Sequence, residues 1–130
     1  MPYEVYKLPR VGDVRPWPGR MRQIVAARLR YADYPEDVVY RAQMIVSELV
    51  TNGFQHGTGD TVGVGCFAHG DVVVLAVASG SPVCLPEIAE PRDIDAESGR
   101  GLHIVRELAD VCTFSGDRVW VVLADFETAA

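Results

Sequence analysis

Residues 47–57 of the chain read Ser-Glu-Leu-Val-Thr-Asn-Gly-Phe-Gln-His-Gly. Glu48 and Asn52 stand four residues apart in this stretch, so on an α-helix their side chains point the same way, one turn from each other. A carboxylate in such a position can take a proton from water or a hydroxyl, and an amide oxygen can ligate a hard cation such as magnesium. The pair therefore indicates nucleotide chemistry.

A long helix is predicted around this stretch, from about Glu36 to about His56. Pro35 stands before its first turn, acidic residues follow at the positive end of the helix dipole, and Gly57 ends it. Apolar residues at helical spacing share one face, with His56 on the same side: Val38, Ala42, Ile45, Val46, Leu49 and Gly53. Glu48 and Asn52 lie along the edge of this stripe, where we expect the rim of a cleft.

The other predicted elements alternate irregularly between strands and helices. We expect a strand over 3–8, a helix whose core-facing stripe is Met21, Ile24, Val25, Leu29 and Ala32, and two strands, 61–68 and 71–78, joined by a tight turn at His69-Gly70. A loop over 79–100, a short helix over 101–110, and a hairpin of 111–114 with 119–123 through Gly116-Asp117 follow. This order indicates an α+β layer sandwich.

The composition fits one domain spanning residues 1–130. Hydrophobic residues make up 48% of the chain, which is enough to bury a single core. A formal net charge of −6 argues against wholesale binding to nucleic acid. No stretch approaches the roughly 20 apolar residues that span a bilayer, and the first residues lack a signal-peptide pattern, so we expect no membrane contact and a cytoplasmic location. The odd set Cys66, Cys84 and Cys112 indicates reduced, buried thiols.

Charge is distributed unevenly along the chain. Six arginines lie within residues 10–30 against one acid, whereas residues 87–97 hold five acids and one arginine. Two interpretations stay open: both segments are solvated faces, or the basic one forms a patch for an acidic protein partner. Lys7 is the only lysine, so cationic work on a phosphate falls to arginine or to backbone N–H groups.

Residues 98–102, Ser-Gly-Arg-Gly-Leu, end the long loop and precede the last predicted helix. Glycines there let the backbone approach a ligand, and the helix N-terminus offers free N–H groups to an anion. The third glycine of a dinucleotide fingerprint is missing, and no Gly-Lys-Ser/Thr of a P-loop occurs.

Together these features resemble the GHKL ATP-binding superfamily, which includes gyrase, heat-shock chaperones, histidine kinases and mismatch-repair ATPases. Within it the chain resembles the anti-sigma-factor serine/threonine kinases, from the helix near Arg20 to the last strand. The matching segments are Val46 to Asn52, His56-Gly57, Ser81-Pro82, Leu85-Pro86 and Glu97 to Leu102. The resemblance implies the Bergerat fold, a two-layer sandwich in which helices cover a mixed, mostly antiparallel sheet and ATP lies between sheet, long helix and lid.

The resemblance also implies roles for individual residues. Glu48 corresponds to the general base that takes the proton of the substrate hydroxyl or water, and Asn52 to the magnesium ligand. His56 and Gly57 match the His-Gly near the nucleotide. The box that wraps the triphosphate corresponds to Gly99, Arg100, Gly101 and Leu102. For the protein as a whole, the resemblance implies ATP and Mg²⁺ as cofactors. It also implies an antagonist protein, a sigma factor or both as partners, and a homodimer as the assembly.

One position departs from the family pattern. Aligning Ser81-Pro82 with the usual Asp-x-Ser-Pro places Ser79, followed by Gly80, where an aspartate accepts the adenine amino group. A serine hydroxyl is shorter and uncharged, and losing a charge-assisted hydrogen bond costs roughly 1.5–3 kcal/mol, on the order of 10–100-fold in affinity.

Two functions of different classes are therefore expected. The first is an ATP-dependent serine/threonine kinase of the anti-sigma type, with Glu48 as its base. The second, motivated by Ser79, is a binding module of the same fold that regulates by protein contact with little or no nucleotide turnover. A histidine kinase catalytic domain is disfavoured, because 130 residues leave no room for a dimerising hairpin with a phosphoacceptor histidine.

Overall fold

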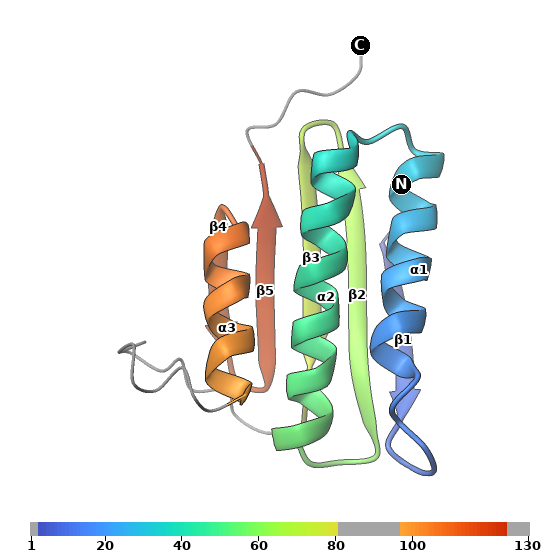
Figure 1. Cartoon of the computed structure of the whole chain (residues 1–130), viewed down its shortest axis with the longest axis vertical. Helices are drawn as coiled ribbons and strands as arrows, with labels where there is room; N and C mark the ends of the chain where they lie inside the picture. Colours follow the sequence, from blue (N-terminus) through green and yellow to red (C-terminus); the bar gives the residue numbers. More distant parts are fainter. Residues whose placement is uncertain (1–2, 81–96, 125–130) are drawn as a thin grey trace.

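The computed structural model describes residues 3–80 and 97–124, and for residues 97–102 it describes the backbone only. Figure 1 shows its helices in front of a single sheet. The elements are, in chain order, β1 (Glu4–Pro9), α1 (Trp17–Tyr31), α2 (Glu36–His56), β2 (Thr61–His69), β3 (Val72–Ala78), α3 (Glu97–Leu108), β4 (Val111–Ser115) and β5 (Arg118–Leu123). The expected α+β class is confirmed.

The five strands form one sheet in the order β1-β2-β3-β5-β4, and every pairing between these strands is antiparallel. The predicted hairpins supply two of the pairings: β2 with β3, where Gly70 has a φ of 58°, and β4 with β5, where Gly116 has a φ of 60°. Both turns thus use the left-handed conformation that glycine adopts without a steric penalty. All three helices lie on one face of the sheet, which makes two layers (Figure 1).

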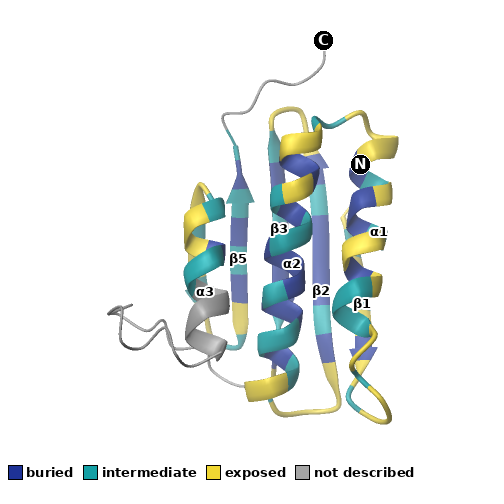
Figure 2. Cartoon of the chain, in the orientation of Figure 1, coloured by how far each residue is buried: buried dark blue, intermediate teal, exposed yellow. Residues whose placement is uncertain are grey.

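The core lies between the helices and the covered face of the sheet, as the dark blue residues of Figure 2 show. Alternate residues of the strands point into it, and those of β2 and β3 are Val62, Val64, Cys66, Ala68, Val73, Leu75 and Val77. The remaining residues of these strands face the side that no helix covers. Burial of Val105 joins α3 to the same core.

Helix α2 has the bounds that the sequence predicts, Glu36–His56. Pro35 precedes it in an extended conformation, Glu36 and Asp37 occupy the first turn, and the Gly57 N–H closes the last turn on the Gly53 carbonyl at 3.0 Å. The predicted apolar stripe is buried, and Val39, Ser47 and Val50 are buried with it. His56, predicted on that side, is exposed, so that part of the prediction is wrong.

Helix α3 begins earlier than predicted. It starts at Glu97, so the segment 98–102 lies in its first turns rather than in the loop before it. Each glycine costs a helix roughly 1 kcal/mol, and packing of α3 against the core outweighs that local preference. Arg41 of α2 fixes the other end of α3, since its Nη1 donates to the Leu108 carbonyl at 3.4 Å and lies 3.5 Å from Asp110 Oδ2.

Several expectations concern residues beyond those described. They are Cys84, the pairs Ser81-Pro82 and Leu85-Pro86, and the loop from Ser81 to residue 96. Of the two thiols that the structure does describe, Cys66 is fully buried and Cys112 is half-buried, in line with the expected reduced, packed cysteines. Within residues 3–80 and 97–124, no helix is long and apolar enough to cross a membrane.

Candidate functional site

The predicted site segments meet at one end of the molecule. In Figure 1 the C-terminal ends of β1, α2 and β3, the β4–β5 turn and the first turn of α3 all lie at the lower end. The chain reaches this end because β2 runs up and β3 runs down again as an antiparallel hairpin. Residues 48–57, 79–80 and 97–102 are therefore brought together although they lie far apart in the sequence.

Glu48 and Asn52 are half-buried on the lower half of α2, at the edge of its buried stripe. Their neighbours Leu49 and Gly53 are buried against the core, so the helix cannot rotate the pair away from this edge without exposing apolar surface. The structure thus places Glu48 and Asn52 one turn apart along one helix edge, as the sequence predicts.

Gly53 and Gly57 let α2 approach the sheet closely. A Cβ on Gly53 would lie 3.1 Å from Val62 Cγ1, which is tighter than ordinary van der Waals contact. A Cβ on Gly57 would collide with the Ser79 carbonyl oxygen at the end of β3. The C-terminal end of α2 therefore rests directly on the end of β3, where adenine is expected to bind.

Ser79 is buried and directed towards the β4–β5 turn. Its N–H donates to the Asp117 carbonyl at 2.9 Å, and its hydroxyl donates to the same oxygen at 3.4 Å. The next residue continues the contact, because the Gly80 N–H donates to Asp117 Oδ2 at 3.3 Å. An aspartate at position 79 would keep the backbone bond, but its ionised side chain has no hydrogen to donate, so only the hydroxyl bond is particular to serine.

Thr58, which follows α2, packs against Gly80, which follows β3. Thr58 Oγ1 donates to the Gly80 carbonyl at 3.0 Å, and Gly80 has a φ of 85°, a conformation that favours glycine. A Cβ on Gly80 would collide with the Thr58 carbonyl oxygen. Backbone packing of this kind helps to fix the end of the site where adenine is expected.

The box Gly99, Arg100, Gly101 and Leu102 enters the site through its backbone. It occupies the first turns of α3, at the same end of the molecule as Asn52 and Ser79 (Figure 1). The first N–H groups of a helix have no partner within the helix and favour an anion. This position suits a phosphate group, as the resemblance implies.

The donor set at this end fits a magnesium ion that is held mainly by phosphate and water. In the described parts of the chain, no three or more His, Cys, Asp or Glu side chains gather closely enough to form a metal cage. Magnesium keeps several waters and takes one or two protein oxygens beside substrate phosphates. One amide oxygen from Asn52, beside the Glu48 carboxylate, meets that requirement.

Two residues of this end are missing from the sequence interpretation. Arg10 donates hydrogen bonds to the main-chain carbonyls of Phe54, Thr58 and Ser79. Asp117 accepts hydrogen bonds from Ser79 and Gly80. Arg10 reads as one of six arginines in a basic segment and Asp117 as a turn residue, so no local pattern marks either. Only the sheet order reveals their place.

A groove of about 380 Å³ lies on the other side of the sheet, away from Glu48 and Asn52. Its floor is the small-residue set Gly63, Gly65, Ala76 and Ala78, and its rim includes Lys7 and Arg118. The groove follows from the small side chains on this face. One end of the groove reaches Thr58, Gly80 and Asp117, so the groove borders the candidate site without including Glu48 or Asn52.

Comparison with known families agrees with this geometry. The family model described as histidine kinase-like ATPase domain matches residues 18–124, from α1 to the end of β5. No curated protein matches the chain. The matched range contains Glu48, Asn52, Ser79 and the 98–102 segment, and it supports the resemblance to the GHKL superfamily. The chain therefore belongs to the histidine kinase-like ATPase domain family.

Proposed function

We propose that this protein binds magnesium-ATP and transfers the γ-phosphate to a serine or threonine of a partner protein, in the manner of the anti-sigma-factor kinases. One observation carries the proposal. Glu48 and Asn52 lie half-buried on one edge of α2, at the end where β3 stops and α3 begins. Membership in an ATPase domain family makes a nucleotide the ligand that this arrangement suits.

Each residue has a part in the proposed reaction. Asn52 holds magnesium through its side-chain oxygen, and Glu48 takes the proton of the attacking hydroxyl on its carboxylate. The N–H groups of the first turn of α3 hold phosphate oxygens, with Gly99 and Gly101 allowing close approach. Bound magnesium-ATP supplies the phosphoryl group and a charge that neutralises it, so the protein mainly positions its groups.

The partners follow from the same family branch. We propose an antagonist protein as the phosphate acceptor, a sigma factor as a second binding partner, and a homodimer in the cytoplasm as the working form. Sedimentation at micromolar concentration checks the dimer, and a single species of monomer mass contradicts it. These proposals rest on the resemblance of the 46–57 and 97–102 segments.

Calorimetric titration with magnesium-ATP tests the nucleotide site. We expect saturable binding by the wild type, loss of binding in Asn52→Ala, and unchanged binding in Gln55→Ala, an exposed amide on the same helix end. Binding that survives Asn52→Ala equally well in magnesium and in EDTA would contradict the assigned metal ligand.

Phosphate transfer tests the base. We expect Glu48→Gln to bind magnesium-ATP as the wild type does, while transfer from labelled ATP to a cognate antagonist protein falls by on the order of 100-fold or more. If Glu48→Gln transfers phosphate at the wild-type rate, Glu48 is not the base.

One observation favours a second function, a module of the same fold that regulates by contact alone. Ser79 donates its N–H and its hydroxyl to the Asp117 carbonyl, a structural role in place of the usual charged acceptor for adenine. Titration distinguishes the two functions directly. A wild-type protein that shows no heat and no fluorescence change with magnesium-ATP at millimolar concentration supports the contact module and removes the kinase.

A further inference from the structure

Arg10 follows β1 and lies at the end of the molecule where the candidate site is. Its Nη1 donates to the Phe54 carbonyl at 3.2 Å, and its Nη2 donates to the Thr58 carbonyl at 3.3 Å and to the Ser79 carbonyl. One guanidinium thus joins the end of α2 to the end of β3. Its backbone N–H is held as well, on the Asp60 carbonyl at 3.0 Å.

One of the carbonyls that Arg10 binds lies at the end of a helix. Phe54 lies in the last turn of α2, where carbonyls lack partners within the helix and carry the negative end of the dipole. The side chain that meets them is always charged and presents its N–H groups in a planar fork. The guanidinium carbon also lies 5.8 Å from the centre of the Phe54 ring, so a cation–π contact adds to the hydrogen bonds.

Glycine brings these carbonyls within reach of a single side chain. A Cβ on Gly57 would collide both with Arg10 Nη2 and with the Ser79 carbonyl oxygen, and a Cβ on Gly80 would collide with the Thr58 carbonyl oxygen. The two loops therefore pack backbone to backbone, with carbonyl oxygens of both turned towards Arg10. The Arg10 guanidinium offsets part of the negative partial charge that these oxygens bring together.

We propose that Arg10 is a positioning residue, which holds the end of α2 against the end of β3 and thereby sets the affinity of the candidate nucleotide site. The helix end carries Asn52 and, one turn earlier, Glu48, whereas the strand end carries Ser79, where the base is expected to bind. A shift of either end changes the distance between Asn52, the proposed metal ligand, and Ser79, where adenine is expected. The consequence for affinity rests on the proposed function. The clamp, by which we mean the hydrogen bonds of Arg10 to the ends of α2 and β3, does not.

A purely structural arginine would behave differently. Its loss would lower the free energy of unfolding, and the molecules that remain folded would bind nucleotide as the wild type does. A positioning residue changes the affinity of folded molecules, and a cation supplied from solution restores part of that affinity. These two readouts separate the roles.

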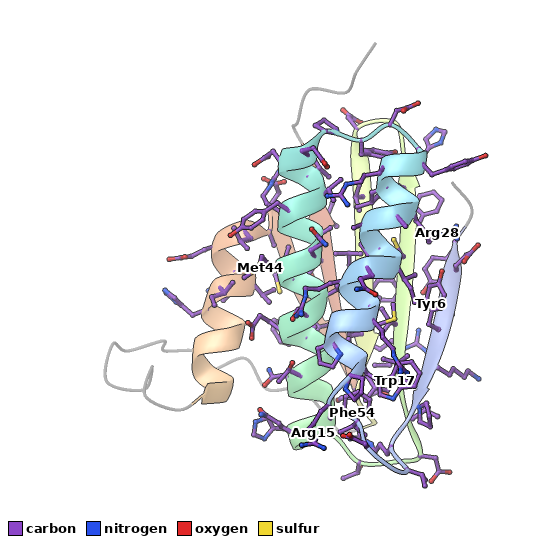
Figure 3. All side chains as sticks on the ribbon, turned by 45° about the vertical axis from the view of Figure 1, so that its right-hand side comes forward. Tyr6, Arg15, Trp17, Arg28, Met44 and Phe54 are labelled. Carbon is purple, nitrogen blue, oxygen red and sulfur yellow. The ribbon has the colours of Figure 1, made fainter. Side chains whose placement is uncertain are left out.

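The experiment compares Arg10→Ala and Arg10→Lys with the control Arg15→Ala. Arg15 is 88% exposed and its side chain pairs with Asp13, so its removal takes one cation from the same segment without touching the loops. Figure 3 places both Arg15 and Phe54 at the lower end of the molecule. Amide hydrogen exchange, read by mass spectrometry, follows peptides that cover residues 53–60 and 76–80, and titration gives the magnesium-ATP affinity of each protein.

We expect Arg10→Ala to speed exchange in both peptides, to leave the peptide over 111–123 unchanged, and to weaken magnesium-ATP binding on the order of tenfold. Low millimolar guanidinium ion should restore part of the affinity in Arg10→Ala and leave the wild type and Arg15→Ala unaffected. Arg10→Lys, which keeps the charge and loses the fork, should fall between, and it serves as the test variant if Arg10→Ala does not fold.

Two results would overturn the proposal: unchanged exchange in both peptides, or faster exchange with unaltered magnesium-ATP affinity. A wild type that binds no nucleotide, combined with faster exchange in Arg10→Ala, supports the clamp and overturns the proposed function. The failure of the inference and the failure of the function are thereby told apart.

Discussion

Arg22 of α1 donates a hydrogen bond of 2.6 Å from Nη1 to the hydroxyl of Ser47, the residue directly before Glu48 on α2. A second bond runs the other way, since Gln43 Nε2 donates to the Arg22 carbonyl at 3.3 Å. The basic segment of residues 10–30 is therefore more than a solvated face or a partner patch. One of its cations joins the two helices beside the candidate base.

This bond predicts coupled effects on stability. Ser47→Ala and Arg22→Ala should each lower the free energy of unfolding by about 1 kcal/mol, because each removes the same hydrogen bond. The double variant should lose less than the sum, with a coupling energy of about 0.5–1 kcal/mol. Urea unfolding of the four proteins measures it, and additive losses would show that the bond contributes nothing.

Gly80 and Gly70 form a matched pair. Both have positive φ, 85° and 58°, so alanine at either position adopts a left-handed conformation at a cost of roughly 1–2 kcal/mol. A Cβ on Gly70 meets nothing within 4 Å, whereas a Cβ on Gly80 collides with the Thr58 carbonyl oxygen. We expect Gly80→Ala to cost about 2 kcal/mol more than Gly70→Ala in urea unfolding. Equal losses would mean that the two loops separate easily.

Gly53 tests how closely α2 must approach the sheet. Alanine there gains about 1 kcal/mol of helix propensity, but its Cβ would lie 3.1 and 3.4 Å from the two methyl carbons of Val62, a fully buried residue of β2. Overpacking of this kind costs about 1–3 kcal/mol, so Gly53→Ala should be destabilising. In a Val62→Ala background the sign should reverse, and the same sign in both backgrounds would contradict the contact.

Cys66 predicts a loss of stability at alkaline pH. Burial raises the pKa of this thiol from 9.0 to about 11, against a smaller opposing effect of Arg28. The folded state therefore keeps the proton that the unfolded chain releases between pH 9 and 11, and the stability present below pH 9 falls over that window by about 2–3 kcal/mol. Burial also raises the pKa of Tyr6 and Tyr34, so the comparison with Cys66→Ala isolates the thiol. An identical pH slope in both proteins would remove it as the cause.

Ser79 predicts a gain of affinity. If the adenine amino group binds at the end of β3, Ser79→Asp should tighten magnesium-ATP binding on the order of 10–100-fold through a charge-assisted hydrogen bond. Ser79→Ala should weaken it, because the hydroxyl is lost. Equal affinities in the wild type and both variants would show that adenine does not bind at Ser79.

The sequence predicts those parts of the fold that depend on local pattern. The bounds of α2, the His69-Gly70 and Gly116-Asp117 turns, and the position of Glu48 and Asn52 at the edge of a buried stripe are confirmed, because helical spacing and turn residues determine them. The predicted start of α3 is wrong because that prediction also relies on local pattern. Glycine is a local signal against helix, and packing on the core overrides it.

The remaining features depend on contacts between residues that are far apart in the sequence and that the strand order brings together. The Arg10 guanidinium binds a carbonyl 69 residues further along the chain, and the Ser79 N–H binds one 38 residues away. No spacing within a segment encodes such contacts. They exist because β1, β3 and β5 bring their ends to one edge of the molecule, which residue patterns alone do not reveal.

The β2–β3 turn lies at the other end of the molecule from the candidate site (Figure 1). The 21 residues of α2 separate the two ends by about 30 Å, at 1.5 Å per residue. His69 and Gly70 are exposed there, and Gly70 has open space around it. A fluorophore attached at this turn would thus stand clear of the candidate nucleotide site, at a separation well suited to energy transfer with a labelled ATP analogue.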